Sequence, residues 1–401
     1  MEKSIKKPFR VTVCVDATKT LGRVVFQSVI EYIRRMERNW VLQCEAGNRL
    51  WLPSEIDSLP LGRLDGVISF ASSESMVRKM RKVGVKFVGV FDDSLDRSIP
   101  SVLSDNEAIG RLAARHLMEL NLKHFVYYGT DLVSNSEARF RGFAAYLADA
   151  GAAAPAHIKV SAEDIMGFSA EKRRAYLGRL GKELHALAHD GRDALGVFAY
   201  GDSMGLTVIE ACREVGLAVP DKVAVIAVAI DEIICELSVP PLSAIQQDAR
   251  KIGQEAAAML DLLLQGREPK NRRIIVPPLS IKVRSSTDCV ATEDLYVKNA
   301  VRLIRERFRN ELHVDDICTS LKVSRRVLEE RFNRALGRAP YEEIVRTRLR
   351  YAETLLAQTS DTNMTVALES GFSGAAVFEQ AFRKTLGMSP KEYRKRFAGI
   401  H

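Results

Sequence analysis

The sequence predicts a two-lobed α/β body, built from two doubly wound parallel sheets, followed by an all-α domain with tandem helix-turn-helix units. From residue 10 to about residue 285, short apolar runs alternate with stretches of helical periodicity. The runs are apolar on both faces, as strands covered by helices on both sides must be. After about residue 285 the strand pattern ends and only helical periodicity continues.

Six apolar runs mark the expected strands of the body. They are RVTVCVD (10–16), DGVISF (65–70), KFVGVF (86–91), HFVYYG (124–129), LGVFAYG (195–201) and KVAVIAVAI (222–230). Two similar halves can be distinguished, the first ending with residues 101–117 and the second running from residue 124 onward. This pattern predicts two lobes with a cleft between them. Ligands of such sheets bind beyond the carboxyl ends of the strands, so the residues that follow each strand are candidates for a ligand site.

A polar break separates the body from the helical part of the chain. It consists of Ser285, Ser286, Thr287 and Asp288. We expect the body over residues 1–285, a linker over 286–295 and a helical domain over 296–401. Residues 292–401 hold 20 Lys and Arg against 15 Asp and Glu, which is five of the formal net charge of +8. This excess favours a polyanionic partner for the helical domain.

Several classes of protein are disfavoured by what the sequence lacks. The six cysteines show no CxxC spacing, so we expect neither a metal site nor a redox dithiol. There is no Ser-His-Asp grouping, no GxxxxGK[ST] loop and no matched pair of carboxylates, so we expect no enzyme and no cofactor. The N-terminus carries no secretory apolar region and no run of 18 apolar residues occurs, which predicts a cytoplasmic protein that does not bind a membrane.

Residues 313–337 have the pattern of a helix-turn-helix unit. The apolar stripe of the first helix is formed by Val314, Ile317, Cys318 and Leu321. Ser324 can cap the second helix, which is expected to pack through Val327, Leu328 and Phe332. The opposite face of the second helix then exposes Arg325, Arg326, Glu329, Glu330, Asn333 and Arg334.

Residues 364–387 repeat this plan, and residues 342–359 are expected to form one long helix between the two units. The packed residues of the second unit are Val366, Ala367, Ser370, Phe378 and Phe382. Its exposed face carries Ala375, Ala376, Glu379, Gln380 and Arg383. Two such units can place two reader helices in successive segments of the DNA major groove, about 34 Å apart.

Residues 300–396 resemble the AraC family of transcription regulators. The resemblance is carried by GF (371–372), VFEQAFRKTLGMSPKEYR (377–394) and RTRLRYAETLL (346–356). It implies base contacts by Arg326, Glu329 and Glu330 in the first reader helix and by Ala375, Ala376 and Gln380 in the second. Arg325 and Arg383 belong to the same exposed faces. Phosphate contacts are expected from the basic residues Lys391, Arg394, Lys395 and Arg396.

Two features of the expected reader helices depart from what DNA recognition usually needs. Ala375 and Ala376 can touch thymine methyl groups but cannot form bidentate hydrogen bonds, so the second helix should read fewer bases than the first. Glu329 and Glu330 can accept from a cytosine amino group. Alternatively, they only pair with neighbouring arginines of their own helix.

The body resembles the bodies of lac-repressor-type regulators and the related periplasmic sugar-binding proteins. The resemblance is carried by LDGVI (64–68), EARFRGF (137–143) and residues 195–228 and 243–264. With RRIIVPPLSIKVRSSTD (272–288) at the junction, the chain is similar to the xylose-operon regulators over nearly its whole length. This resemblance implies an activator that binds operator DNA as a homodimer, contacts RNA polymerase and responds to a sugar such as xylose.

A sugar site needs polar groups that bind neighbouring hydroxyls and an aromatic face for the ring. By position in the resembling bodies, the candidates are Asp16, Arg139, Asp202, Gln247, Tyr200 and Phe91, with Phe70 as a further aromatic. Each has a structural alternative: Arg139 as a surface charge, Asp202 as a helix cap, Asp16 as a turn former and the aromatics as core.

One departure concerns the ligand. Where the resembling bodies end a strand with an aspartate that binds sugar hydroxyls, this chain has AVAIDEI (227–233), with Ala229 at that position. Either Asp231 takes over this role or the ligand differs. The expected function is a sugar-responsive transcription regulator of carbohydrate catabolism; the alternatives are a solute-binding protein and a regulator whose body serves only dimerisation.

Overall fold

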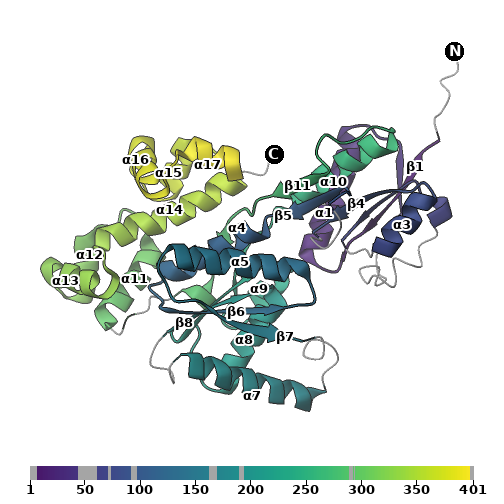
Figure 1. Cartoon of the computed structure of the whole chain (residues 1–401). Coiled ribbons are helices and arrows are strands. Elements are labelled where there is room, and N and C mark those ends of the chain that lie inside the picture. The colour runs from purple at the N-terminus through teal and green to yellow at the C-terminus, as the bar shows by residue number, and fades with distance from the viewer. Residues whose placement is uncertain are drawn as a thin grey trace.

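The computed structural model describes residues 7–43, 61–70, 74–91, 97–161, 169–188, 194–288, 292 and 294–397. The chain forms two α/β lobes and a helical domain (Figure 1). The first lobe lies at the upper right of Figure 1, the second at the bottom and the helical domain at the upper left. No helix within these residues is both long enough and apolar enough to span a membrane.

The first lobe contains a parallel sheet with the strand order β11-β5-β4-β3-β1-β2. Its strands are β1 (Phe9–Cys14), β2 (Trp40–Gln43), β3 (Gly66–Ser69), β4 (Lys86–Val90), β5 (Ser101–Ser104) and β11 (Arg273–Val276). Helices α1 (Thr20–Arg35) and α10 (Ala249–Leu264) pack on one face, while α3 (Glu74–Lys82) packs on the other. A single 3₁₀ turn, η1 (Leu61–Arg63), precedes β3.

The second lobe contains a sheet with the strand order β12-β10-β9-β8-β6-β7, in which only β12 is antiparallel to its neighbour. Its strands are β6 (His124–Thr130), β7 (Ala156–Val160), β8 (Leu195–Ala199), β9 (Val223–Val228), β10 (Ser243–Ile245) and β12 (Ile281–Lys282). Helices α4 (Asn106–Glu119) and α5 (Ser134–Asp149) cover one face, and α7 (Ala170–Leu187) and α8 (Asp202–Glu214) cover the other. A short helix, α9 (Glu232–Leu237), follows β9. The predicted pair of doubly wound sheets is confirmed.

The lobes are not the two consecutive halves that the sequence pattern suggests. Residues 101–117 were expected to close the first half, but α4 packs on the sheet of the second lobe. In turn, α10 and β11 return to the first lobe. The chain therefore crosses between the lobes three times, near residue 105 and over residues 246–248 and 277–280. Periodicity identifies an amphipathic helix but does not say which sheet the helix covers.

Helices α4 and α5 touch backbone to backbone at two glycines. A Cβ atom on Gly110 would lie 2.1 Å from the carbonyl oxygen of Arg139, and one on Gly142 would lie 2.1 Å from that of Glu107. Any larger residue at either position would force the helices apart. Because closely packed interiors have low compressibility, we expect α4 and α5 to move as one unit.

The body extends beyond residue 285, where the sequence-based boundary was drawn. The Ser286 hydroxyl donates to the Val225 carbonyl at 2.6 Å, and the Thr287 hydroxyl lies 2.9 Å from Nε2 of His116 in α4. Both residues belong to a 3₁₀ turn, η2 (Ser285–Thr287), and are buried. The next helix begins at Leu295, and residues 289–291 and 293 of the expected linker lie outside the described residues.

The helical domain contains seven helices within residues 294–397. They are α11 (Leu295–Arg307), α12 (Val314–Leu321), α13 (Arg325–Leu336), α14 (Pro340–Gln358), α15 (Asn363–Glu369), α16 (Ala375–Leu386) and α17 (Pro390–Phe397). The long central helix is confirmed as α14, with α12 and α13 near one end and α15, α16 and α17 near the other (Figure 1). The predicted cap is also confirmed, since the Ser324 hydroxyl accepts from the Val327 N–H. Val327 itself was expected to be packed, but it is 38% exposed.

Candidate effector site and DNA-binding face

Arg139 lies at the centre of a buried polar cluster beside two of the chain crossings. It is 2% exposed, so the surface-charge alternative is wrong. Its Nε donates to Oδ1 of Asn106 at 3.0 Å, and one Nη donates to the Tyr200 carbonyl at 2.5 Å. The other Nη lies 3.5 Å from Oε1 of Gln247, which also accepts from the Ser104 hydroxyl at 2.9 Å. Two predicted site residues, Arg139 and Gln247, are thus in one cluster.

Two predicted aromatic residues adjoin this cluster. The Arg139 guanidinium lies 4.5 Å from the centroid of the Tyr200 ring. The Tyr200 hydroxyl donates to Oδ1 of Asn135 at 2.8 Å, and the Asn135 amide donates to the Phe91 carbonyl at 3.5 Å. Phe91 directly follows β4 with a φ of 61°, a left-handed conformation that costs a non-glycine residue free energy. Its ring lies 5.9 Å from that of Phe70.

Asp202 uses its carboxylate within the protein. Oδ1 accepts from the Ser203 N–H at 2.7 Å, and Oδ2 accepts from the N–H groups of Ile230, at 2.8 Å, and Asp231. Burial raises the pKa of Asp202 above its ordinary value, while these backbone donors act in the opposite direction. Asp202 is the first residue of α8, whose N-cap is Gly201. Its carboxylate therefore fixes the loop after β9 rather than capping a helix.

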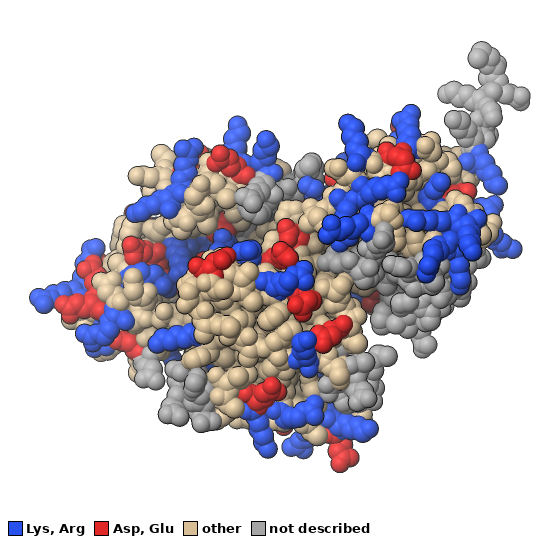
Figure 2. Space-filling view, viewed as in Figure 1, with Lys and Arg blue, Asp and Glu red and all other residues tan. Residues whose placement is uncertain are grey.

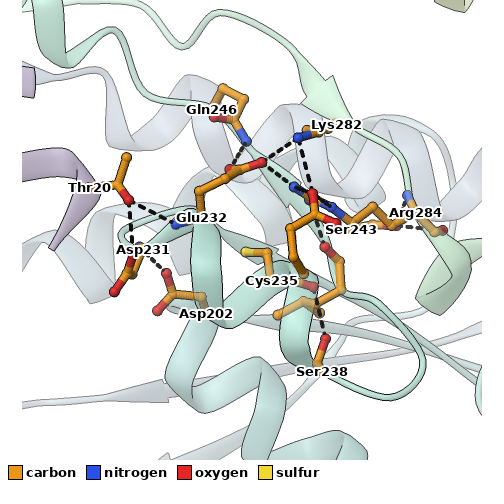
Figure 3. A network of polar contacts seen from close by, with 12 residues as sticks. Thr20, Asp202, Asp231, Glu232, Cys235, Ser238, Ser243, Gln246, Lys282 and Arg284 are labelled. Atoms are coloured by element: carbon orange, nitrogen blue, oxygen red, sulfur yellow. Dashed lines mark hydrogen bonds and ion pairs between the residues drawn. The ribbon is translucent and has the colours of Figure 1, made fainter.

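The other two aspartates hold turns and join the lobes. Oδ1 of Asp16 accepts from the Thr18 N–H at 3.0 Å, which is the turn-forming alternative. Oδ1 of Asp231 accepts from the Thr20 hydroxyl of the first lobe at 2.9 Å (Figure 3). Lys19 lies 3.8 Å from the same carboxylate. Asp231, considered above as a substitute for the missing sugar-binding aspartate, thus bridges the two lobes.

A hollow of about 140 Å³ lies where the lobes meet. Its lining comes from α1, the segment after β9, the second and third chain crossings and the start of α10. It includes Thr20, Ala229 and Gln247 and the charged residues Glu232, Asp248 and Arg250. Ala229 accepts from the Gln247 side chain through its carbonyl, at 3.3 Å. Ala229, the position at which the resemblance leads us to expect an aspartate, is therefore connected to Arg139 through Gln247.

The sequence reasoning missed three polar residues of this cluster: Ser104, Asn106 and Asn135. All three are buried and hydrogen-bonded. Ser104 ends β5 and Asn106 follows it by two residues, so the rule that ligands bind beyond strand ends pointed to both. Nothing in the sequence pattern distinguished Asn135 from an ordinary residue in the first turn of α5.

The exposed face of α13 carries paired charges. Arg325 donates to Glu329 at 2.9 Å and lies 3.5 Å from Asp315 of α12. Arg326 donates to Glu330 at 3.0 Å, although 88% of its side chain is exposed. The pairing alternative for both glutamates is therefore present in the structure. Exposed pairs of this kind are weak, so a base edge can compete for either arginine.

The exposed face of α16 is almost free of charge in its first two turns. Ala376, Gln380 and Arg383 are exposed, while Ala375 is half-buried. Val377 is 47% exposed and lies 50 residues after the equally placed Val327. Two exposed valines at equivalent positions offer apolar contacts to thymine methyl groups. The 50-residue repeat between the units was the feature that would have indicated both.

The basic residues of α17 differ in environment. Lys391 and Lys395 are exposed, but Arg394 is half-buried and donates to the Thr359 carbonyl at 3.2 Å, just beyond the end of α14. The side chain of Arg396 lies outside the described residues. Because Lys391 is exposed and Arg394 is bonded within the protein, Lys391 suits a phosphate contact better than Arg394 does. Over α12 and α13, by contrast, Figure 2 shows acidic and basic side chains interleaved.

Glu119, the last residue of α4, joins the body to the helical domain. It accepts two N–H bonds from Arg350 of α14, at 3.0 and 2.5 Å, and lies 3.0 Å from Arg346 of the same helix. Burial acts to raise the pKa of Glu119, but Arg350, Arg346 and Arg115 outweigh it and hold that pKa below its ordinary value. The carboxylate therefore stays charged and paired.

A second ion pair between α4 and α14 lies beside the one formed by Glu119 and Arg350. Arg115, one turn earlier in α4, lies 3.2 Å from Glu353 of α14, and the Tyr393 hydroxyl of α17 donates to the same carboxylate at 3.1 Å. The side-chain amide of Asn121 donates to the Ala335 carbonyl of α13 at 2.9 Å. We call Arg115, Glu119, Arg346, Arg350 and Glu353 the joint. It connects one end of α4 to the helix that carries both helix-turn-helix units.

Comparison with known proteins agrees with both parts of the fold. Residues 85–287, half of the chain, match the family of the periplasmic binding protein-like domain, and residues 317–396 match a helix-turn-helix domain family. The chain is 28% identical to the xylose operon regulatory protein of Escherichia coli (strain K12), over 97% of both chains. It is 24% identical to the protein of the same name from Haemophilus influenzae, over 96% of this chain and 98% of that one.

A solved structure of the xylose-binding transcription activator xylR is similar over 98% of this chain and 100% of that one, with 26% identity and a TM-score of 0.59. Together with the fold, these matches define a class: a DNA-binding transcription regulator rather than an enzyme. The chain belongs to the periplasmic-binding-protein-like family and joins that body to an AraC-type helix-turn-helix domain, as the xylose operon regulators do.

Proposed function

We propose that the chain senses a small sugar-like effector between its lobes and thereby controls genes of carbohydrate catabolism. The relatives along the whole chain are named as xylose operon regulators, and one is named as xylose-binding. Arg139, Gln247, Tyr200 and Phe91 are the proposed effector contacts. The missing aspartate at Ala229 argues that the effector need not be xylose.

The observation that carries the proposal is the placement of α4. Asn106, its first residue, binds Arg139 in the buried cluster, and Glu119, its last residue, binds α14 in the joint. Arg139 lies on α5, which is fixed to α4 by the contacts at Gly110 and Gly142. An effector that moves Arg139 therefore moves the α4–α5 pair, and with it the joint.

A shift at the joint alters how both units meet DNA, because α14 links them (Figure 1). An effector changes the equilibrium only through its different affinity for the two arrangements. Coupling between two sites is commonly about 5- to 150-fold in affinity. The proposed reading residues are Arg325, Arg326, Glu329 and Glu330 of α13 and Ala375, Ala376, Gln380 and Arg383 of α16.

The relatives support further proposals about partners. We propose that the chain acts in the cytoplasm as a homodimer on operator DNA, and that it contacts RNA polymerase as an activator. A homodimer would present four reader helices, and its operator would then contain two bipartite half-sites.

The test compares the wild type with Glu119→Gln and with Glu107→Gln. Glu107 is an exposed residue of the same helix, and its side chain forms a surface pair with Arg141. Effectors are first found by thermal shift among pentoses, hexoses and uronic acids. We expect the effector to change the operator affinity of the wild type and of Glu107→Gln in fluorescence anisotropy. Glu119→Gln should keep the thermal shift but lose the change in affinity.

The alternative, a body that serves only dimerisation, predicts a different result. In that case no compound would alter either the thermal stability or the operator affinity of the wild type. A thermal shift with an unchanged operator affinity in the wild type would contradict the coupling through α4.

A further inference from the structure

Arg139 is a buried cation without an acidic partner among the described residues. Within that part of the chain, its side chain donates to the Asn106 amide oxygen, the Tyr200 carbonyl and, at 3.5 Å, the Gln247 amide oxygen. All three are neutral. A buried charge is costly unless an opposite charge or a full set of strong hydrogen bonds compensates for it. The cluster is therefore electrostatically incomplete without a further group.

Within the part of the chain that the structure describes, the nearby carboxylates have other partners. The carboxylate of Asp202 accepts from backbone N–H groups, and that of Asp231 accepts from the Thr20 hydroxyl of the first lobe (Figure 3). Lys19 of the first lobe lies 3.8 Å from the Asp231 carboxylate. Asp16 accepts from Thr18 within its own turn. Two carboxylates line the hollow, but Glu232 pairs with Lys282 and Arg284, and Asp248 accepts from the Lys251 N–H. Ala229, which lines the hollow next to Gln247, has no charge.

Building on the proposed function, we infer that the effector is an acid: a sugar-like molecule whose carboxylate pairs with Arg139. A planar guanidinium matches a carboxylate with two parallel hydrogen bonds, and this pairing is stronger than a bond to a neutral hydroxyl. The amides of Gln247 and Asn135 and the hydroxyl of Tyr200 are hydrogen-bonded within the protein, and we expect them to exchange these partners for the hydroxyl groups of the same molecule. The effector class is thus a uronic or aldonic acid rather than a neutral sugar.

Ala229 then determines the specificity. In this chain Ala229 adds no further carboxylate to the hollow, and Arg139, which contacts the neighbouring Gln247, is left to pair with the carboxylate of the ligand. An aspartate there would add a further negative charge beside the bound carboxylate, and neighbouring like charges disfavour each other. The same substitution would favour a neutral sugar, whose hydroxyls can donate to the new carboxylate.

The test measures binding of matched pairs to the full-length chain by isothermal titration calorimetry: glucose against glucuronate, and galactose against galacturonate. The variants are Arg139→Gln, Ala229→Asp and, as an uncharged control of the same shape, Ala229→Asn. We expect the acid of at least one pair to bind the wild type about tenfold or more tighter than its neutral partner, the difference that one charged hydrogen bond supplies. Arg139→Gln should abolish this preference.

The Ala229 variants test whether the effector is an acid even if Arg139→Gln fails to fold. Ala229→Asp should reduce the preference for the acid by about tenfold or more, whereas Ala229→Asn should preserve it. If in both pairs the neutral sugar bound the wild type as tightly as its acid, or tighter, this inference would be overturned and the proposed sensor function would stay intact. If no member of either pair and no other tested sugar bound, the sensor function itself would fail.

Discussion

The two helix-turn-helix units share a scaffold but differ on the face that meets DNA. Leu328 and Phe332 of α13 correspond to Phe378 and Phe382 of α16, and all four side chains are fully buried. Both helices end at a glycine in the left-handed conformation, with φ of 66° at Gly337 and 70° at Gly387. Residues 50 positions apart therefore pack in the same way, and the two helices end in the same way.

The exposed residues at the start of each helix do not follow the repeat. Where α13 begins with Arg325 and Arg326, α16 begins with Ala375 and Ala376. Arginine can form bidentate bonds to guanine, whereas alanine offers only apolar contact to thymine. Packing fixes the scaffold, and a few exposed side chains are left to set the choice of bases. We therefore expect α13 to select the sequence and α16 mainly to position the protein.

Of the substitutions that test this difference between α13 and α16, Arg326→Ala should have the largest effect on DNA recognition. Loss of one bidentate base contact should reduce discrimination between operator and scrambled DNA by about 1–3 kcal/mol. Ala376→Ser, the control at the equivalent position of α16, should change that ratio much less, because a methyl contact is small. Competition binding on the two DNAs measures the ratio. An unchanged ratio for Arg326→Ala would refute the role of this residue as a base reader.

A smaller effect should separate Lys391 from Arg394. Lys391 is exposed, so Lys391→Ala should weaken binding to all DNA sequences and lower the salt slope of log K by about 1. Arg394 donates to the Thr359 carbonyl, so Arg394→Ala should lower thermal stability and leave the salt slope nearly unchanged. Binding titrations between about 50 and 200 mM salt measure the slope. A salt slope lowered equally in both variants would show that both residues bind phosphate, and an unchanged slope in Lys391→Ala would contradict its assignment.

Much of the fold was predictable because it depends on local periodicity. Strands that are apolar on both faces predicted the two parallel sheets, and the repeated apolar stripes of the helices predicted the two helix-turn-helix units. The assignment of α4 to the second lobe was not predictable, since an amphipathic pattern does not specify its partner sheet. The exposed Val327 was mispredicted for a related reason: hydrophobicity alone does not exclude a position on the outer face.

The candidate site was predictable only in part. Strand ends and family resemblance pointed to Arg139, Gln247 and Tyr200, which the structure brings into one cluster. They also pointed to Asp202, whose carboxylate the backbone N–H groups of a distant loop occupy. Such tertiary contacts have no sequence signature. The joint was missed for the same reason, because its charges look like ordinary exposed faces of two helices until those faces meet.

A selection of bound DNA from a randomised pool, performed with the wild type and with Arg326→Ala, tests most directly whether α13 selects the sequence. We expect a bipartite site with strong base preferences in one segment and weak preferences, mainly for A·T pairs, in the segment one helical turn away. Arg326→Ala should flatten the strong segment and leave the weak one unchanged. Equal base preferences in both segments, or a strong segment that survives in Arg326→Ala, would contradict the claim that α13 selects the sequence.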